Sequence, residues 1–129
     1  MKKLFVLGLV IITFIGCGGK DSKKEDETTV MLSPKEQLIA DGKKLFNSNK
    51  AACFSCHQLD KKVIGPSVME IAKIYRAENA DMVAFLRKEA EPIVDPSQYN
   101  VMETNFAILK TMTDEELKSL EAYMMSILD

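Results

Sequence analysis

Two cysteines and a histidine, Cys53, Cys56 and His57, form the pattern C-x-x-C-H in this chain. Two thiols at this spacing, followed at once by an imidazole, are typical of a site where haem is bound covalently through both sulfurs. The imidazole then lies beneath the iron as its proximal ligand. The motif therefore predicts one haem c, bound through Cys53 and Cys56 with His57 on the iron, and the rest of the chain has to fold around that group.

Two other chemistries use a C-x-x-C pair. A closed structural zinc site usually takes four Cys or His ligands, whereas this chain has three Cys and one His in total. One of those three, Cys17, belongs to a separate motif. A dithiol redox site is expected near a βαβ unit, and no segment of the sequence reads as a convincing strand. Zinc and dithiol chemistry are therefore the weaker interpretations.

The first 16 residues have the layout of an export signal. Lys2 and Lys3 form a basic start, residues 4–15 form a mainly apolar run, and Gly16 is a small residue. The run is shorter than the ~20 residues that span a bilayer. We therefore interpret residues 1–16 as a cleaved signal peptide.

Residues 14–17, Phe-Ile-Gly-Cys, resemble the lipobox of bacterial lipoproteins, with Phe14 where Leu is usual. That resemblance implies cleavage before Cys17 and its acylation. The alternative is an ordinary signal peptide and a free Cys17 thiol, which would be reactive in an oxidising compartment. Lipidation would anchor an exported protein to a bacterial cell membrane, with its domain in the periplasm or at the cell exterior.

The remaining chain divides by composition into a linker and one domain. Residues 17–33 are rich in small and charged residues, so we expect a flexible tether. Residues 34–129 are long enough for a single domain. Loss of residues 1–16 would remove two of the 17 basic residues and none of the 19 acidic ones, leaving a net charge of −4. Nucleic acid is not expected as a partner, because phosphate binding requires a concentrated basic face.

Capping signals predict the helices of this domain. A Ser, Thr or Asn before an apolar periodic run marks a helix start, and a Glu three residues later completes a capping box. Four such starts occur, at Ser33 with Glu36, Ser67 with Glu70, Asn79, and Thr113 with Glu116. The first helix is expected to end near residues 47–49. An all-α fold of about four helices follows from this pattern.

With the C-x-x-C-H motif, these helices resemble the class I cytochromes c, in particular the small bacterial c551/c552-type monohaem carriers. The similarity runs over residues 34–129. In that family the first and last helices cross with a small residue and aromatics at the contact, and four residues match this pattern: Gly42, Phe46, Leu120 and Tyr123. The resemblance implies a cytochrome c-like fold around one covalently bound haem.

Gly65-Pro66-Ser67 resembles the family's segment that follows the haem motif. The resemblance implies that the Pro66 carbonyl accepts a hydrogen bond from His57, which would fix the tautomer of the ligand. Pro66 also fits a simple turn residue before a capped helix.

The composition of the chain limits which residues can be the sixth iron ligand. His57 is the only histidine, so a second His ligand is excluded, and eight methionines are present. Met1 would leave with the signal and Met31 lies in the tether. Four others fall on expected helices, where packing is the simpler role: Met69, Met82, Met124 and Met125.

Met102 and Met112 remain, in a stretch from residue 90 to residue 113 without sustained periodicity. So long an irregular segment is uncommon in a compact domain unless it is functional. Met102, followed three residues later by Asn105, resembles the family's Met ligand and is therefore the expected axial ligand. Met112 and an open sixth position stay as alternatives.

His/Met ligation raises the reduction potential and is found in electron-carrying cytochromes. Because both axial positions would be filled, we expect an electron carrier and not an enzyme. Five apolar residues are expected behind the ring: Ile64, Val68, Ile71, Ile74 and Phe106. Redox proteins of a respiratory chain are the expected partners, held in small transient interfaces. The alternatives are a haem enzyme or gas sensor with an open distal site, or a fixed electron-relay subunit of a larger complex.

Overall fold

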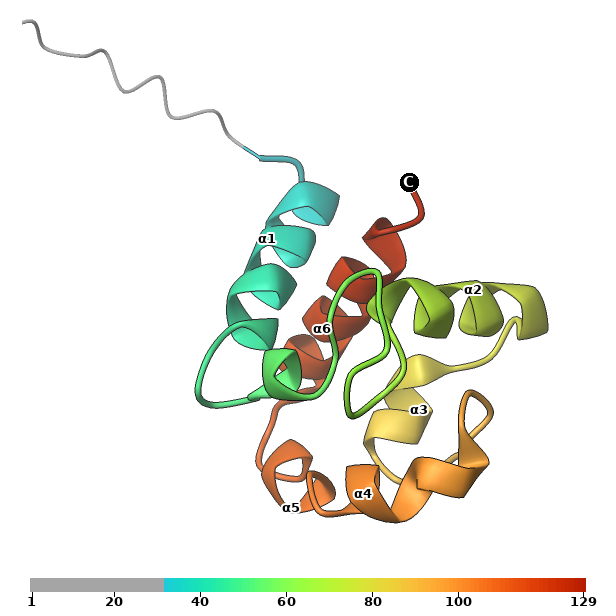
Figure 1. Ribbon diagram of the computed structural model, residues 1–129. Coiled ribbons are helices and arrows are strands. Elements are labelled where there is room, and N and C mark those ends of the chain that lie inside the picture. Colours follow the sequence, from blue (N-terminus) through green and yellow to red (C-terminus); the bar gives the residue numbers. More distant parts are fainter. Residues whose placement is uncertain (1–31) are drawn as a thin grey trace, which may run out of the picture. The chain divides into compact units, whose positions relative to one another are not determined.

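The computed structural model describes residues 32–129 (Figure 1). The expected signal peptide 1–16, the lipidation site Cys17 and most of the tether 17–33 lie outside these residues. Within residues 32–129 the fold is all-α, with six α-helices, two single-turn 3₁₀-helices and no strand. In chain order the elements are α1 (Pro34–Phe46), η1 (Cys53–Ser55), α2 (Val68–Glu78), α3 (Met82–Leu86), η2 (Pro96–Gln98), α4 (Tyr99–Glu103), α5 (Phe106–Leu109) and α6 (Asp114–Ser126). The predicted fold class is confirmed.

The long helices begin where their capping signals predict. Ser33 and Glu36 form a reciprocal capping box at α1, and Thr113 and Glu116 form another at α6. Each box satisfies two backbone donors that the first helical turn leaves without intrahelical partners. At α2 the Ser67 hydroxyl accepts from the Glu70 amide, which is the capping half of the predicted box.

The predicted start of the third helix is wrong. Asn79 is the C-cap of α2, in the left-handed region at φ 47° and ψ 41°. Asp81 is the N-cap of α3, where its carboxylate accepts from the Ala84 amide at 2.8 Å. Asn tolerates the left-handed conformation better than most residues, so it can end one helix as readily as it can begin another.

The sequence suggests that the stretch from residue 90 to residue 113 is irregular throughout, but the structure shows short helices in it. It contains η2, α4 and α5, none longer than five residues. Met102 therefore lies on a short helix. One-turn helices show too few residues for a periodic pattern to be read.

Helices α1 and α6 lie side by side and form the frame of the domain (Figure 1). A Cβ placed on Gly42 would lie 1.8 Å from the Ser119 carbonyl oxygen, so only glycine permits this approach of the two backbones. One turn further, the rings of Phe46 and Tyr123 meet edge to face with centroids 5.3 Å apart. Leu120 is 1% exposed beside them. The crossing implied by the resemblance is confirmed.

The other helices attach to this frame and surround the remaining core. α2 buries Val68, Ile71, Ala72 and Tyr75, and both α2 and α3 contact α6. Among residues 32–129, no helix has the length and apolar character needed to cross a membrane.

Replacing Gly42 with Ala should destabilise the protein by about 1–3 kcal/mol, the cost of overpacking a tight contact. In a helix without this contact the same change would stabilise by roughly 0.5–1 kcal/mol. Denaturant unfolding of the holoprotein, followed by far-ultraviolet circular dichroism, measures the difference. Lys43→Ala, at the adjacent exposed position, is the control and should change stability by less than about 0.5 kcal/mol. An unchanged midpoint for Gly42→Ala would contradict the close crossing.

Candidate haem-binding site

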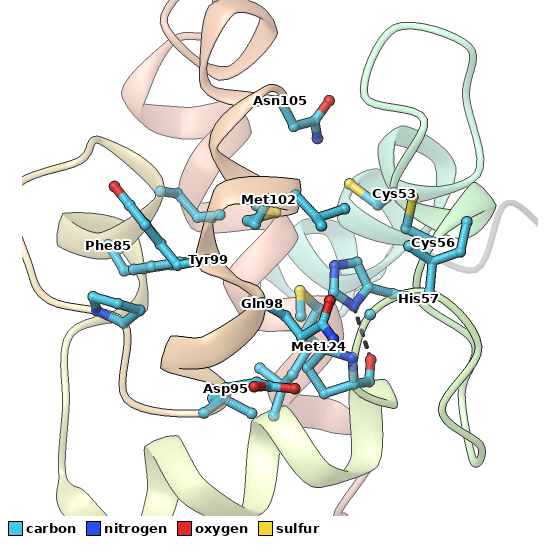
Figure 2. A pocket seen from close by; sticks show the side chains of 18 of the residues that line it. Cys53, Cys56, His57, Phe85, Asp95, Gln98, Tyr99, Met102, Asn105 and Met124 are labelled. Carbon is cyan, nitrogen blue, oxygen red and sulfur yellow. Dashed lines mark hydrogen bonds between the residues drawn. The ribbon is translucent and has the colours of Figure 1, made fainter.

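An apolar cleft lies between the C-x-x-C-H segment, helices α3 and α4, and α6 (Figure 2). It encloses about 1170 Å³, counting the space that opens to solvent. Cys53, Cys56, His57, Pro66 and Met102 all line it. The structure therefore brings together every predicted site residue that lies within residues 32–129.

The C-x-x-C-H segment forms a single tight turn. The amides of Cys56 and His57 both donate to the Cys53 carbonyl, at 3.2 and 2.9 Å. Residues three apart in such a turn project from the same side, so both thiols face one wall of the cleft with His57 next to them, as Figure 2 shows. This arrangement is the one that two bonds to a single macrocycle require.

A strained residue introduces this turn. Ala52 has φ 52° and ψ 22°, in the left-handed region that costs a residue with a Cβ roughly 1–2 kcal/mol. It lines the cleft and immediately precedes Cys53. Sequence reasoning missed this residue, because alanine carries no signal for a left-handed conformation.

The imidazole of His57 is held from two sides. Its Nδ1 lies 2.8 Å from the Pro66 carbonyl oxygen, the contact that the resemblance implies, and this leaves Nε2 as the nitrogen available to a metal. Gly65 packs against the ring, and a Cβ there would lie 2.4 Å from His57 Cε1. The Gly65 amide donates to the Cys56 carbonyl at 2.9 Å, which fixes its backbone against the motif.

Three methionines reach the cleft, and Met112 is not among them. Met102 projects from α4 and is half-buried, while Met82 and Met124 line the cleft from α3 and α6 and are 2% and 8% exposed. Met112 is buried near Leu117, on a separate hollow. The structure thus places Met102 on the cleft with His57, and it places Met112 elsewhere.

The apolar lining differs in part from the one predicted. Of the five residues expected behind the ring, only Ile64 and Ile71 line the cleft. Val68 and Phe106 are buried in the core behind it, and Ile74 is half-buried on the outer side of α2. An aromatic cluster takes their place: Phe85 packs against Tyr75, Tyr99 and Phe106 with centroids 5.7–6.4 Å apart. Tyr75, Phe85 and Tyr99 line the cleft.

The Cys53 thiol does not have the property that an exchange site requires. Burial raises the pKa of the Cys53 thiol to about 11, whereas dithiol redox motifs depend on a lowered thiol pKa. Among residues 32–129, no three His, Cys, Asp or Glu side chains are grouped so that they could hold a metal ion. The raised pKa of Cys53 therefore argues against the dithiol interpretation of the motif.

The cleft is almost free of charge. Of the described residues that line it, none is Lys or Arg, and Asp95 is the one carboxylate. Asp95 bonds to Lys62 at 2.7 Å and to the Ser97 hydroxyl at 2.6 Å, and the Lys62 bond is the larger cause of the lowered pKa of Asp95. A neutral, apolar space of this size fits a flat hydrophobic macrocycle, with Cys53 and Cys56 to bind it and His57 to reach its metal.

These features define the protein as a covalent haem protein built on an all-α fold. The family model described as Cytochrome c matches residues 39–128, so the chain belongs to the cytochrome c family. Its cofactor is haem c, covalently attached through Cys53 and Cys56, and its function is electron transfer. No curated protein matches the chain closely enough to count as a relative.

Replacing Gly65 with Ala should displace the His57 ring and weaken its bond to Pro66. The new methyl group would overlap the imidazole, and overpacking of this kind costs about 1–3 kcal/mol. The measurement is the proton NMR spectrum of the ferric holoprotein, in which the ring signals of the axial His report its orientation. Lys61→Ala, an exposed change in the same loop, is the control. Identical ring signals in Gly65→Ala and the parent protein would refute the role of this glycine.

Proposed function

We propose that this protein is a membrane-anchored monohaem cytochrome of the c551/c552 type. It carries one electron at a time between respiratory redox partners, with His57 and Met102 as the axial ligands. The observation that carries the proposal is the convergence of Cys53, Cys56, His57 and Met102 on one apolar cleft. The first three come from a single turn and the fourth from α4, 45 positions beyond His57.

The chain's own groups account for the function of the site. Bound haem c supplies an iron atom that gains or loses one electron. Pro66 holds His57 through Nδ1, which keeps Nε2 directed into the cleft and strengthens it as a donor. The thioether of Met102 would occupy the other axial position and favour the reduced state. The apolar walls exclude water, so little reorganisation accompanies the change of charge.

The proposed anchor is supported by the sequence outside the described residues. A short apolar run and a lipobox-like segment end at Cys17, and cytochrome c domains are typically exported. Cys17 would be the acylated N-terminus, and residues 17–33 would link it to the domain, residues 34–129. Mass spectrometry of the mature protein tests this directly: an unmodified Cys17, or cleavage at another position, would exclude the anchor.

Two measurements on the holoprotein test the proposed function. A pyridine haemochrome spectrum should show haem bound through two thioethers, and Cys53→Ala and Cys56→Ala should each leave one. The ferrous holoprotein should bind carbon monoxide slowly, because Met102 occupies the sixth position. Fast binding, at the rate of a five-coordinate haem, would favour the haem enzyme or gas sensor. Co-purification of one stable partner from solubilised membranes would instead favour the fixed relay subunit.

Met102→Leu should remove the charge-transfer absorption of the ferric iron–sulfur bond and lower the reduction potential. The substitution keeps the side-chain volume and removes the sulfur, so packing changes little. Met112→Leu and Met124→Leu make the same change at a methionine outside the cleft and at one inside it. Both should keep the absorption band. If the band is lost in Met124→Leu and kept in Met102→Leu, the ligand is Met124 of α6 and not Met102.

A further inference from the structure

The segment that carries Met102 is acidic over its whole length. Residues 89–104, called here the distal segment, contain four carboxylates and no Lys or Arg: Glu89, Glu91, Asp95 and Glu103. Like charges so close in sequence repel one another. Basic groups from outside the segment would offset this repulsion.

The distal segment contacts the core through partly buried residues: Val94, Tyr99 and Met102. None of the five described residues of α4 is buried. Tyr99 is half-buried and packs against Phe85 and Phe106, with ring centroids 6.4 and 6.0 Å away. Met102 itself is half-buried on the cleft. In contrast, the longer helix α6 buries five residues in the core.

Two lysines bind the distal segment from outside it. Lys62, in the loop that follows the C-x-x-C-H motif, bonds to Asp95 at 2.7 Å. Lys88, just after α3, bonds to Glu103 at 2.6 Å, directly beside Met102. Lys88 adopts φ 65°, a strained conformation for a residue with a side chain, and its ammonium lies 6.0 Å from the centre of the Phe106 ring.

We propose that Lys62 and Lys88 are positioning residues for Met102: they hold the acidic distal segment against the haem cleft and so keep the sixth ligand in place. This inference rests on the proposed function, because it takes Met102 as the ligand. Lys62 connects Asp95, in the first half of the distal segment, to the loop that follows the C-x-x-C-H motif. Lys88 holds Glu103, near the end of the segment. Exposed ion pairs of this kind are screened by salt, so the sixth position opens more often as ionic strength rises.

The experiment measures carbon monoxide binding to the ferrous holoprotein after rapid mixing. Carbon monoxide binds only when Met102 has left the iron, so its rate scales with the open fraction. Lys62→Gln and Lys88→Gln should each raise the rate about twofold to fivefold, the usual range for an exposed ion pair. The double variant should raise it further. Going from about 0.01 M to about 1 M salt should raise the rate of the parent protein and change the double variant little.

Two control variants separate this effect from a general loss of charge or stability. Lys61→Gln makes the same charge change next to Lys62, and Lys61 takes part in none of the ion pairs found among residues 32–129. Lys50→Gln breaks an ion pair with Glu116 at the start of α6, and neither residue belongs to the distal segment. Neither should change the carbon monoxide rate. Equal increases in the controls and the test variants would overturn the proposal.

A charge exchange provides the rescue. Asp95→Lys combined with Lys62→Glu should restore the slow rate that either single change removes, since the ion pair is re-formed with its polarity reversed. If the double variant does not recover the parent rate, the Lys62–Asp95 ion pair does not hold the distal segment.

Amide hydrogen exchange tests separately whether the two lysines hold the distal segment and whether Met102 is the ligand. In Lys62→Gln and Lys88→Gln, residues 99–104 should lose protection while α1 and α6 keep theirs. This loss of protection is expected whether or not Met102 binds iron. Unchanged protection would therefore refute the role of the two lysines in holding the distal segment. If Met102→Leu binds carbon monoxide no faster than the parent protein, the ligand assignment is wrong, and the positioning role falls with it.

Discussion

The contact between the C-x-x-C-H turn and the loop that returns over it is the constraint on which the rest of the site depends. Gly65 lies so close to the His57 ring that no Cβ fits between them, and the Pro66 carbonyl accepts from the same imidazole. These two contacts set the orientation of the ring. Because the thiols of Cys53 and Cys56 belong to the same turn, the groups that would hold haem c keep one arrangement relative to the ring.

Stability is distributed unevenly around this centre. The α1–α6 crossing is made by backbone contact at Gly42 and by aromatic packing of Phe46 against Tyr123, and both helices carry complete capping boxes. The wall that carries Met102 has short helices and exposed ion pairs instead. Segments with few buried contacts open more easily than a core. The proximal half of the site, which carries the C-x-x-C-H turn, is thus held by close backbone contacts, and the distal half, which carries Met102, by weaker attachments.

Local signals in the sequence were sufficient for the starts of the frame helices and for the C-x-x-C-H motif. The α1–α6 crossing and the Pro66 contact followed from the family resemblance, and the strained Ala52 was missed. Capping boxes specify α1 and α6 because they act within four residues, and the C-x-x-C-H motif acts within five. The distal half could not be read in the same way. Helices α4 and α5 are too short to show a period, and the Lys62–Asp95 pair joins residues 33 positions apart. Met82 and Met124 were assigned to packing, yet their side chains reach both the core and the cleft, a distinction that helical spacing alone does not make.

The near-absence of charge in the cleft bears on the redox chemistry of the site. The described lining offers one carboxylate, Asp95, which Lys62 neutralises, and the remainder is apolar or uncharged. Surroundings of low polarity penalise the more highly charged state of a buried centre, and ferric haem carries one more positive charge than ferrous haem. Burial would therefore act in the same direction as the thioether ligand proposed at Met102, since both favour the reduced form. Any change that exposes the cleft, or removes the lysine that balances Asp95, alters this electrostatic balance as well as the geometry of the ligand.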